Sequence, residues 1–152
     1  MGQTLQGVQS LMRTVGKVEP ARLRAFDLFA GLNEEELQEV AEACQEYRVP
    51  SGSILIRQGQ VGRDLFLMEE GSVRIYSEKK GETQFLGTVR APEVLGEMAL
   101  MTPERVRTAN VEALSDLHLL GISLAQFILF LRRFPTLKSC FHQLIATRTS
   151  SQ

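Results

Sequence analysis

Residues 95–111 read LGEMALMTPERVRTANV, a stretch that differs from the strand-like runs on both sides of it. It opens on Gly96 and Glu97, continues through a short apolar turn and ends with Arg107 beside the hydroxyl of Thr108. A helix start offers unpaired backbone amides, a glycine lets a ligand approach the backbone, and arginine adds a permanent planar charge that suits phosphate oxygens. Glu97 would repel phosphate, so it is suited to accept a hydrogen bond from a sugar hydroxyl. The stretch therefore indicates a nucleotide site.

Short strand-like runs separated by glycine and proline surround this stretch. We expect strands at residues 54–57, 65–69, 73–77, 83–89 and 111–122, the last with a break at 115–116. Runs of this length, spaced about 8–12 residues apart, are typical of antiparallel sandwiches and barrels rather than parallel βαβ units.

Helical patterns flank the strands. Asn33 and Glu36 form a capping-box pattern ahead of an apolar stripe that reaches Cys44. Ser123 and Gln126 repeat the pattern, and Pro135 ends the helix that they begin. The apolar stripe of this helix consists of Leu124, Phe127, Ile128 and Leu131. A last helix carries Leu137, Cys140, Phe141 and Leu144 on one face and is expected to fray over 147–152.

The first 32 residues contain scattered apolar positions. Leu5, Val8, Leu11 and Met12 suit a short amphipathic helix. We therefore predict an α+β protein in which an N-terminal helical segment, 1–32, precedes a domain at 33–152. That domain is an antiparallel β-roll (a jelly-roll-like double-stranded β-helix) closed by two C-terminal helices.

Two linked motifs in the opening stretch resemble the phosphate-binding cassette of the cyclic nucleotide-binding domain family. They are Gly-Glu-Met-Ala-Leu at 96–100 and Arg-Thr-Ala at 107–109. The family occurs in bacterial catabolite activators, cyclic-nucleotide-dependent kinases and cyclic-nucleotide-gated channels. The resemblance extends from about Leu28 to Phe141, with Gly59, Gly71 and the run 64–67 in supporting positions. Pro92 departs from it, because the family commonly has glycine there.

The resemblance implies a ligand, cGMP or cAMP, and a role for each matching residue. Arg107 would hold the cyclic phosphate, and Glu97 would accept from the ribose 2′-hydroxyl. Backbone amides around Met98, Ala99 and Thr108 would complete the cradle. The hydroxyl of Thr108 could accept from the guanine 2-amino group, which slightly favours cGMP. The expected binding residues are Gly96, Glu97, Met98, Ala99, Arg107, Thr108 and Ala109.

The family mechanism implies a sensor that passes a movement of the last helix to a linked effector or to a dimer partner. The effector would lie beyond residue 152, and a homodimer would form through the terminal helices. His142 lies beside the apolar face of that helix and could contact the base. The alternative is a degenerate β-roll that binds no nucleotide and serves as a protein-interaction or dimerisation module.

Composition argues against other functions. A formal net charge of -1 gives no basic face for nucleic acid, and no apolar run reaches the ~20 residues of a membrane span. Two histidines in unrelated contexts, with no Walker loop, nucleophile elbow or metal-ligand spacing, predict that the chain is not an enzyme. Cys44 and Cys140 are too few for a disulfide scaffold, so we expect reduced thiols and a cytoplasmic location.

Overall fold

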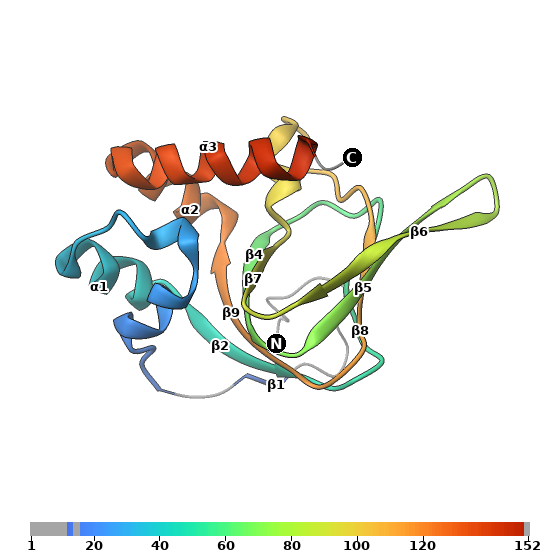
Figure 1. The fold of residues 1–152 in the computed structure, drawn as a ribbon, viewed down its shortest axis with the longest axis horizontal. Helices are drawn as coiled ribbons and strands as arrows, with labels where there is room; N and C mark the ends of the chain where they lie inside the picture. The colour runs from blue at the N-terminus through green and yellow to red at the C-terminus, as the bar shows by residue number, and fades with distance from the viewer. Residues whose placement is uncertain (1–11, 14–15, 151–152) are drawn as a thin grey trace.

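The computed structural model describes residues 12–13 and 16–150, and two antiparallel sheets form its β-roll (Figure 1). The first sheet has the spatial order β1 (Met12–Arg13), β2 (Gln45–Val49), β9 (Leu117–Ser123), β4 (Asp64–Glu70) and β7 (Glu93–Leu95). The second has the order β3 (Ile54–Ile56), β8 (Asn110–Ala113), β5 (Ser72–Lys79) and β6 (Glu82–Arg90). This architecture confirms the predicted fold class.

Helical segments cover one end of the roll. They are the 3-10 helices η1 (Pro20–Ala25), η2 (Asp27–Phe29) and η3 (Glu97–Met101), and the α-helices α1 (Glu34–Glu42), α2 (Leu124–Arg133) and α3 (Pro135–Ser150). Helix α3 lies across the top of the molecule in Figure 1, and its C-terminal end points toward η3. None of the helices within the described residues has the length and apolar character needed to cross a bilayer.

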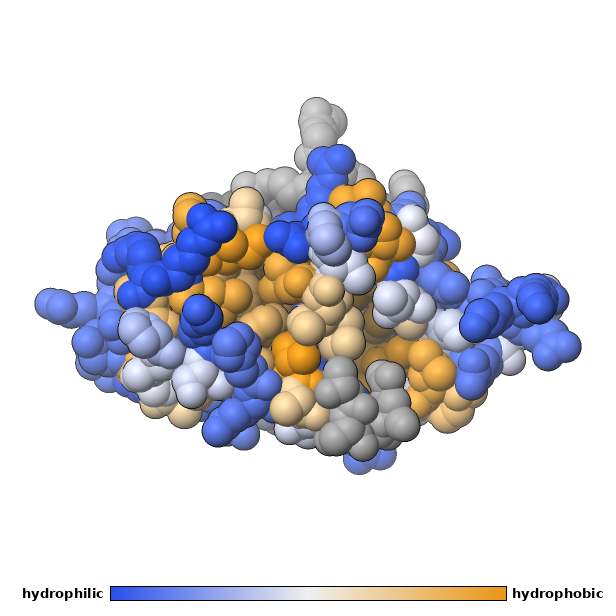
Figure 2. Space-filling model, turned by 90° about the horizontal axis from the view of Figure 1, so that it is seen from above, coloured by the Kyte–Doolittle hydropathy of each residue, from blue (hydrophilic) through white to orange (hydrophobic). Residues whose placement is uncertain are grey.

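The hairpin of β5 and β6 projects away from the helical end of the molecule (Figure 1). Viewed from above, its tip is hydrophilic, whereas apolar side chains gather over the middle of the molecule (Figure 2). The base of the hairpin, at residues 72–77 and 84–90, forms one wall of the roll.

The alternating side chains of β4 divide the core into two clusters. Leu65 and Leu67 face a helical cluster with Phe29 and Phe127, whereas Phe66 on the opposite face joins the interior of the roll. The rings of Phe127 in α2 and Phe141 in α3 meet edge to face, with centroids 5.6 Å apart. Helix α3 is therefore fixed at its beginning and middle by apolar packing.

Both helix starts lie where the sequence predicts them. The Asn33 side chain accepts from the Glu36 amide at 2.8 Å and the Glu36 carboxylate accepts from the Asn33 amide at 3.0 Å, a complete capping box. Ser123 likewise accepts from the Gln126 amide at 3.1 Å. The reciprocal bond differs, because the Gln126 side-chain oxygen accepts from the Ser123 hydroxyl instead.

Other boundaries differ from the prediction. Strands β2 and β7 were not expected, because polar residues interrupt the apolar pattern of β2 and β7 has only three residues. Met12 lies in a strand and not in a helix, since β1 pairs with β2; Leu5, Val8 and Leu11 lie outside the described residues. Helix α3 does not fray at 147 but continues to Ser150. The division of the chain at residue 32 stays a prediction.

Candidate functional site

A cavity of about 780 Å³ lies between the base of the β5–β6 hairpin and the two motifs at 96–100 and 107–109, which are called the cassette below. Strands β3, β5, β6 and β7 line it together with η3, the segment 107–111 and one residue of α3. Its volume is within the range of about 300–1,000 Å³ that is usual for small-molecule sites. The cavity is thus large enough for a nucleotide.

The cassette begins with a backbone turn that only glycine adopts readily. Gly96 has φ of 90°, in the left-handed region, and directly precedes η3. Because the chain turns there, Glu97 at the start of η3 points inward and is only 5% exposed. Ala91–Pro92 is a cis peptide bond just before β7, and β7 nevertheless keeps its register with β4.

Arg107 enters the cavity from the segment that precedes β8. Its guanidinium donates to two backbone carbonyls, to that of Gly96 at 3.0 Å and to that of Asp64 at 2.8 Å. A Cβ atom added at Gly62 or at Gly96 would lie 2.8 Å from the guanidinium atoms. The two glycines therefore leave the space that Arg107 occupies, a role for Gly96 that the sequence alone did not reveal.

The charge of Arg107 has little compensation from the protein. The residue is 6% exposed, and no salt bridge joins it to a carboxylate within the described residues. Burial lowers the pKa of the guanidinium, although nearby Asp64 and Glu97 oppose this effect. Burial also raises the pKa of the Asp64 carboxyl to about 6, against the opposing charges of Arg107 and Arg63. A buried cation that donates only to neutral carbonyls favours an anionic ligand.

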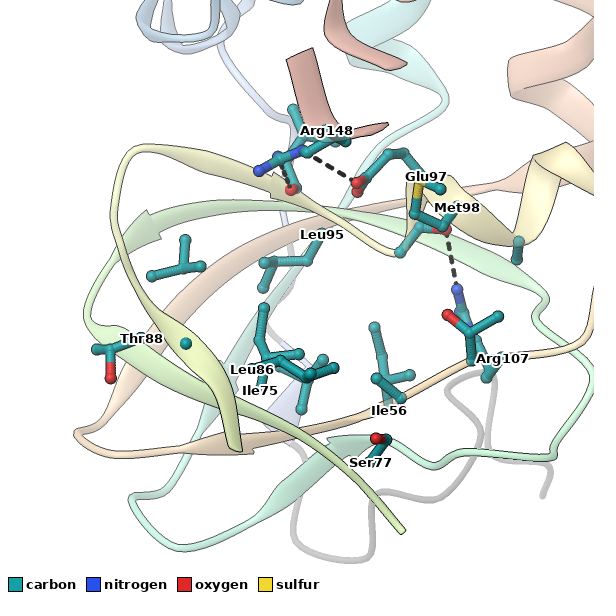
Figure 3. A pocket seen from close by; sticks show the side chains of 18 of the residues that line it. Ile56, Ile75, Ser77, Leu86, Thr88, Leu95, Glu97, Met98, Arg107 and Arg148 are labelled. Atoms are coloured by element: carbon teal, nitrogen blue, oxygen red, sulfur yellow. Dashed lines mark hydrogen bonds and ion pairs between the residues drawn. The ribbon is translucent and has the colours of Figure 1, made fainter. Parts of the chain in front are cut away.

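Glu97 has a charged partner that the sequence analysis missed. Arg148, near the end of α3, places its Nε 3.0 Å from the Glu97 carboxylate. Its Nη2 lies 3.0 Å from the Glu93 carboxylate and donates to the Val94 carbonyl at 2.8 Å. Burial raises the pKa of the Glu97 carboxyl, and the charge of Arg148 opposes this rise. Figure 3 shows Arg148 beside Glu97 at the edge of the cavity.

The wall opposite the cassette is mostly apolar. Ile75 in β5 and Leu86 in β6 lie opposite Leu95 in β7 (Figure 3). Ile56 in β3 lies on the same side as Ile75. Polar side chains on the same wall are those of Ser77, Gln84 and Thr88. Apolar surface with a few polar groups suits a planar base, whereas the cassette side suits phosphate and ribose.

All seven residues expected to bind the ligand line this one cavity: Gly96, Glu97, Met98, Ala99, Arg107, Thr108 and Ala109. The apolar residues of the last helix do not, since Leu137 and Phe141 belong to the helical core. His142 is exposed and absent from the lining. The sequence pattern did not identify Arg148 as a site residue. It lies one helical turn after Leu144, the last apolar residue expected on that helix face, in a stretch expected to fray.

A second polar group lies outside the cavity, between η1 and strands β2, β4 and β9. One ligand atom each from Glu46, Glu69 and His118 lies within 4.8 Å of the others, a spacing that could hold a metal ion. Arg22 already contacts both carboxylates there, at 2.9 Å to Glu69 and 3.0 Å to Glu46, and His118 contacts Glu46. The arginine supplies the positive charge that a metal would bring.

Known proteins match the chain over most of the described fold. The sequence profile of the cyclic nucleotide-binding domain matches residues 46–134. The cyclic AMP receptor protein of Thermus thermophilus is 29% identical over 127 residues, 83% of this chain and 58% of that protein. The cGMP-dependent protein kinase egl-4 of Caenorhabditis elegans is 30% identical over 128 residues, 83% of this chain and 16% of the kinase.

A solved structure agrees with these relatives. The crystal structure of the Thermus thermophilus catabolite activator protein is similar with a TM-score of 0.73 and 29% identity, over 83% of this chain and 59% of that one. The aligned region is between 16% and 58% of the length of the two curated relatives. Since the family profile covers more than half of the chain and the cavity contains both cassette motifs, the chain belongs to the cyclic nucleotide-binding domain family.

Proposed function

We propose that this chain is a regulatory sensor module that binds a cyclic nucleotide in the cavity and carries out no chemistry on it. The observation that supports this most strongly is Arg107, whose buried guanidinium donates only to backbone carbonyls among the described residues. A cyclic phosphate carries one negative charge and would compensate the charge of Arg107, which is itself only 6% exposed. The amides around Met98, Ala99 and Thr108 would add donors.

Glu97 is proposed to recognise the ribose. Its carboxylate is buried, lines the cavity and cannot favour phosphate, so a 2′-hydroxyl donor is its natural ligand. The charge of Arg148 opposes the effect of burial on its pKa and thereby favours the ionised form that accepts such a bond. Phosphate and ribose would then be recognised from one side of the cavity, with the base directed toward Ile75 and Leu86.

The choice of base is proposed to depend in part on Thr108. This residue lines the cavity and is exposed, so its hydroxyl is accessible to a ligand. A guanine in the syn conformation presents a 2-amino donor that adenine lacks, which favours cGMP slightly over cAMP. One neutral hydrogen bond is worth ~0.5–1.5 kcal/mol, so the preference is at most about tenfold.

The signal is proposed to leave through α3. The helix is joined to the cassette by Arg148, so a ligand that rearranges the cassette shifts the equilibrium position of the helix. A linked effector domain, or a second copy bound through the terminal helices, would read that shift. Both partners are proposals that follow from the family.

Isothermal titration calorimetry of the chain with cGMP, cAMP and their 2′-deoxy analogues tests the proposal. We expect saturable 1:1 binding of both natural ligands, weaker binding of the 2′-deoxy forms in the wild type, and loss of that difference in Glu97→Gln. Absence of binding at millimolar concentration would contradict the proposal and favour the interaction module.

The base preference has its own test. Thr108→Ala should lower the affinity for cGMP more than that for cAMP, by up to about tenfold. Thr88→Ala is the matched control, because Thr88 also lines the cavity but lies outside the cassette. Equal losses for the two nucleotides in Thr108→Ala would remove the argument for cGMP.

A further inference from the structure

Strand β5 extends further than the strand that pairs with it on one side. β5 continues to Lys79, whereas β8 begins at Asn110, which pairs with Tyr76. Residues 107–109, which precede β8, line the cavity instead of continuing along β5. The backbone groups of β5 beyond Tyr76 therefore need other partners on that side.

The pairing of β5 with β8 indicates which residue would come next. Antiparallel ladders alternate hydrogen-bonded and non-hydrogen-bonded pairs, so every second pair is of the same kind. The Leu114 amide donates to the Ser72 carbonyl at 2.9 Å, and the register is unbroken over 73–76. Continued at the same spacing, this series of pairs would join the backbone of Glu78 to that of Thr108.

Gln58, in the turn after β3, occupies that place with its side chain. Its Nε2 donates to the Glu78 carbonyl at 3.0 Å, and its Oε1 accepts from the Glu78 amide at 2.7 Å. A primary amide offers a donor and an acceptor side by side, as a backbone residue does in a ladder. Gln58 thus makes both ladder bonds of Glu78, in the position that the series gives to Thr108.

The backbone of the same turn holds the segment that leaves the sheet. The Gln58 amide donates at 2.9 Å to Oδ1 of Asn110, a buried side chain at the start of β8. The Gly59 amide donates to the Arg107 carbonyl at 2.9 Å, and the Arg107 amide donates to the Gln60 carbonyl at 2.8 Å. This turn therefore joins the segment that carries Arg107 to the hairpin that forms the opposite wall of the cavity.

We propose that Gln58 is a positioning residue of the nucleotide site. Its side-chain amide replaces the Thr108 backbone beside β5, which lets residues 107–109 enter the cavity and fixes the hairpin against them. The effect on a ligand rests on the proposed function, whereas the replacement is a property of the protein alone. Gln58 is not among the described residues that line the cavity, so it acts through its neighbours. Since both bases would rest on the hairpin, its loss should weaken cGMP and cAMP alike.

Gln58→Met tests the proposal, because it keeps the length of the side chain and removes both bonds to Glu78. Amide hydrogen exchange of the full chain is followed residue by residue by NMR, and calorimetry gives the affinity for each nucleotide. We expect the Glu78 amide to exchange at least about tenfold faster and the Arg74 amide, within the β5–β8 pairing, to change by less than about twofold. Affinity for cGMP and cAMP should fall by the same factor, roughly three- to tenfold.

Two further variants separate these bonds from a general loosening of the hairpin. Gln58→Glu keeps the oxygen that accepts from the Glu78 amide, so this amide should exchange more slowly than in Gln58→Met. Gln38→Met is the matched control, because the Gln38 side chain donates to Glu42 at 3.1 Å on the exposed face of α1. It should change neither the exchange of Glu78 nor the affinity.

Other outcomes would overturn one part of the proposal or the other. Unchanged exchange of Glu78 in Gln58→Met, or equally fast exchange in Gln58→Glu, would overturn the replacement of the Thr108 backbone. Faster exchange with unchanged affinity, or a loss confined to one nucleotide, would overturn the positioning role and leave the proposed function intact. A wild type that binds neither nucleotide would contradict the proposed function, whereas the exchange of Glu78 would still decide the replacement.

Discussion

Two buried or half-buried arginines of this molecule have opposite surroundings. Arg22, in η1, contacts the carboxylates of Glu69 and Glu46 directly, and its hydrogen bond to Glu69 raises its pKa. Arg107, in the cavity, donates only to two carbonyls among the described residues, and burial lowers its pKa. The first charge is compensated by the fold, whereas the second has no ionic partner among the described residues, and we propose that a ligand supplies one.

This difference explains why similar residue types have different roles in one small domain. Around Arg22 the protein supplies two carboxylates, and the result is an ion-pair network that ties the N-terminal segment to β2 and β4. Around Arg107 the fold supplies space instead, because Gly62 and Gly96 have no side chains to fill it. A buried charge without an ionic partner costs stability, and binding of an anion recovers that cost.

The largest effect is expected at Arg107 itself. Arg107→Ala should lower the affinity for either cyclic nucleotide by about 100-fold or more, since the variant loses the charge-assisted hydrogen bonds that we propose to the phosphate. Calorimetry measures the loss. Arg107→Lys keeps the charge without the planar fork, so its affinity should lie between those of the wild type and Arg107→Ala. Affinity of Arg107→Ala within about threefold of the wild type would mean that the arginine does not hold the phosphate.

A smaller loss is expected when the space around Arg107 is filled. The Cβ of Gly62→Ala would lie 2.8 Å from the guanidinium carbon, so the flexible end of Arg107 must move. We expect affinity to fall by about tenfold with little change in the unfolding midpoint. Ser77→Ala is the control, because it changes a residue that lines the cavity without touching Arg107. Gly81→Ala is unsuitable, since Gly81 has φ of 80° and an alanine there would strain the backbone. An affinity change in Gly62→Ala no greater than that in Ser77→Ala would contradict this account.

Arg22 should show the reverse behaviour. Arg22→Ala leaves two half-buried carboxylates and His118 without their cation, so the free energy of unfolding should fall by about 1–2 kcal/mol, between the values for surface and buried pairs. Nucleotide affinity should stay within about twofold. Arg24→Ala, at an exposed ion pair, serves as the control for urea denaturation and should cost less than about 0.5 kcal/mol. A large loss of affinity in Arg22→Ala would erase the contrast between the two arginines.

Asp64 should make the stability depend on pH, because burial raises its pKa to about 6 from 3.8. Between these values the folded state binds a proton that the unfolded chain does not, so this group adds stability as pH falls from about 6 to about 4. In Asp64→Asn that contribution should disappear. Urea denaturation of both proteins at pH 4.5 and pH 7 gives the difference, and an identical pH dependence would show that Asp64 titrates normally.

Sequence patterns predicted the parts of the fold that depend on local signals. The capping box at Asn33 and the cap at Ser123 fix two helix starts through bonds within four residues, so the pattern contains the whole interaction. Strands β2 and β7 were missed because their existence depends on neighbours, β9 and β4, that are distant in sequence. The opposite faces of β4, in contrast, follow directly from its alternation.

The residues around the cavity also divide into those that local sequence signals identify and those that depend on distant parts of the chain. The two cassette motifs are contiguous, so their residues could be assigned from sequence and all of them line the cavity. Arg148 lies 51 positions after Glu97 in the printed sequence and reaches it only because α3 folds back over the roll. The roles of Gly62 and Gly96 beside Arg107 likewise exist only in three dimensions.

The most direct test of the central claim is thermal unfolding of the wild type and Arg107→Ala over a series of cGMP and cAMP concentrations. If the charge of Arg107 is left for a phosphate, the variant should be at least as stable as the wild type without nucleotide. Added nucleotide should then raise the midpoint of the wild type in proportion to the logarithm of its concentration and leave that of the variant unchanged. A variant that is clearly less stable without ligand, or a wild type whose midpoint does not move, would contradict the claim.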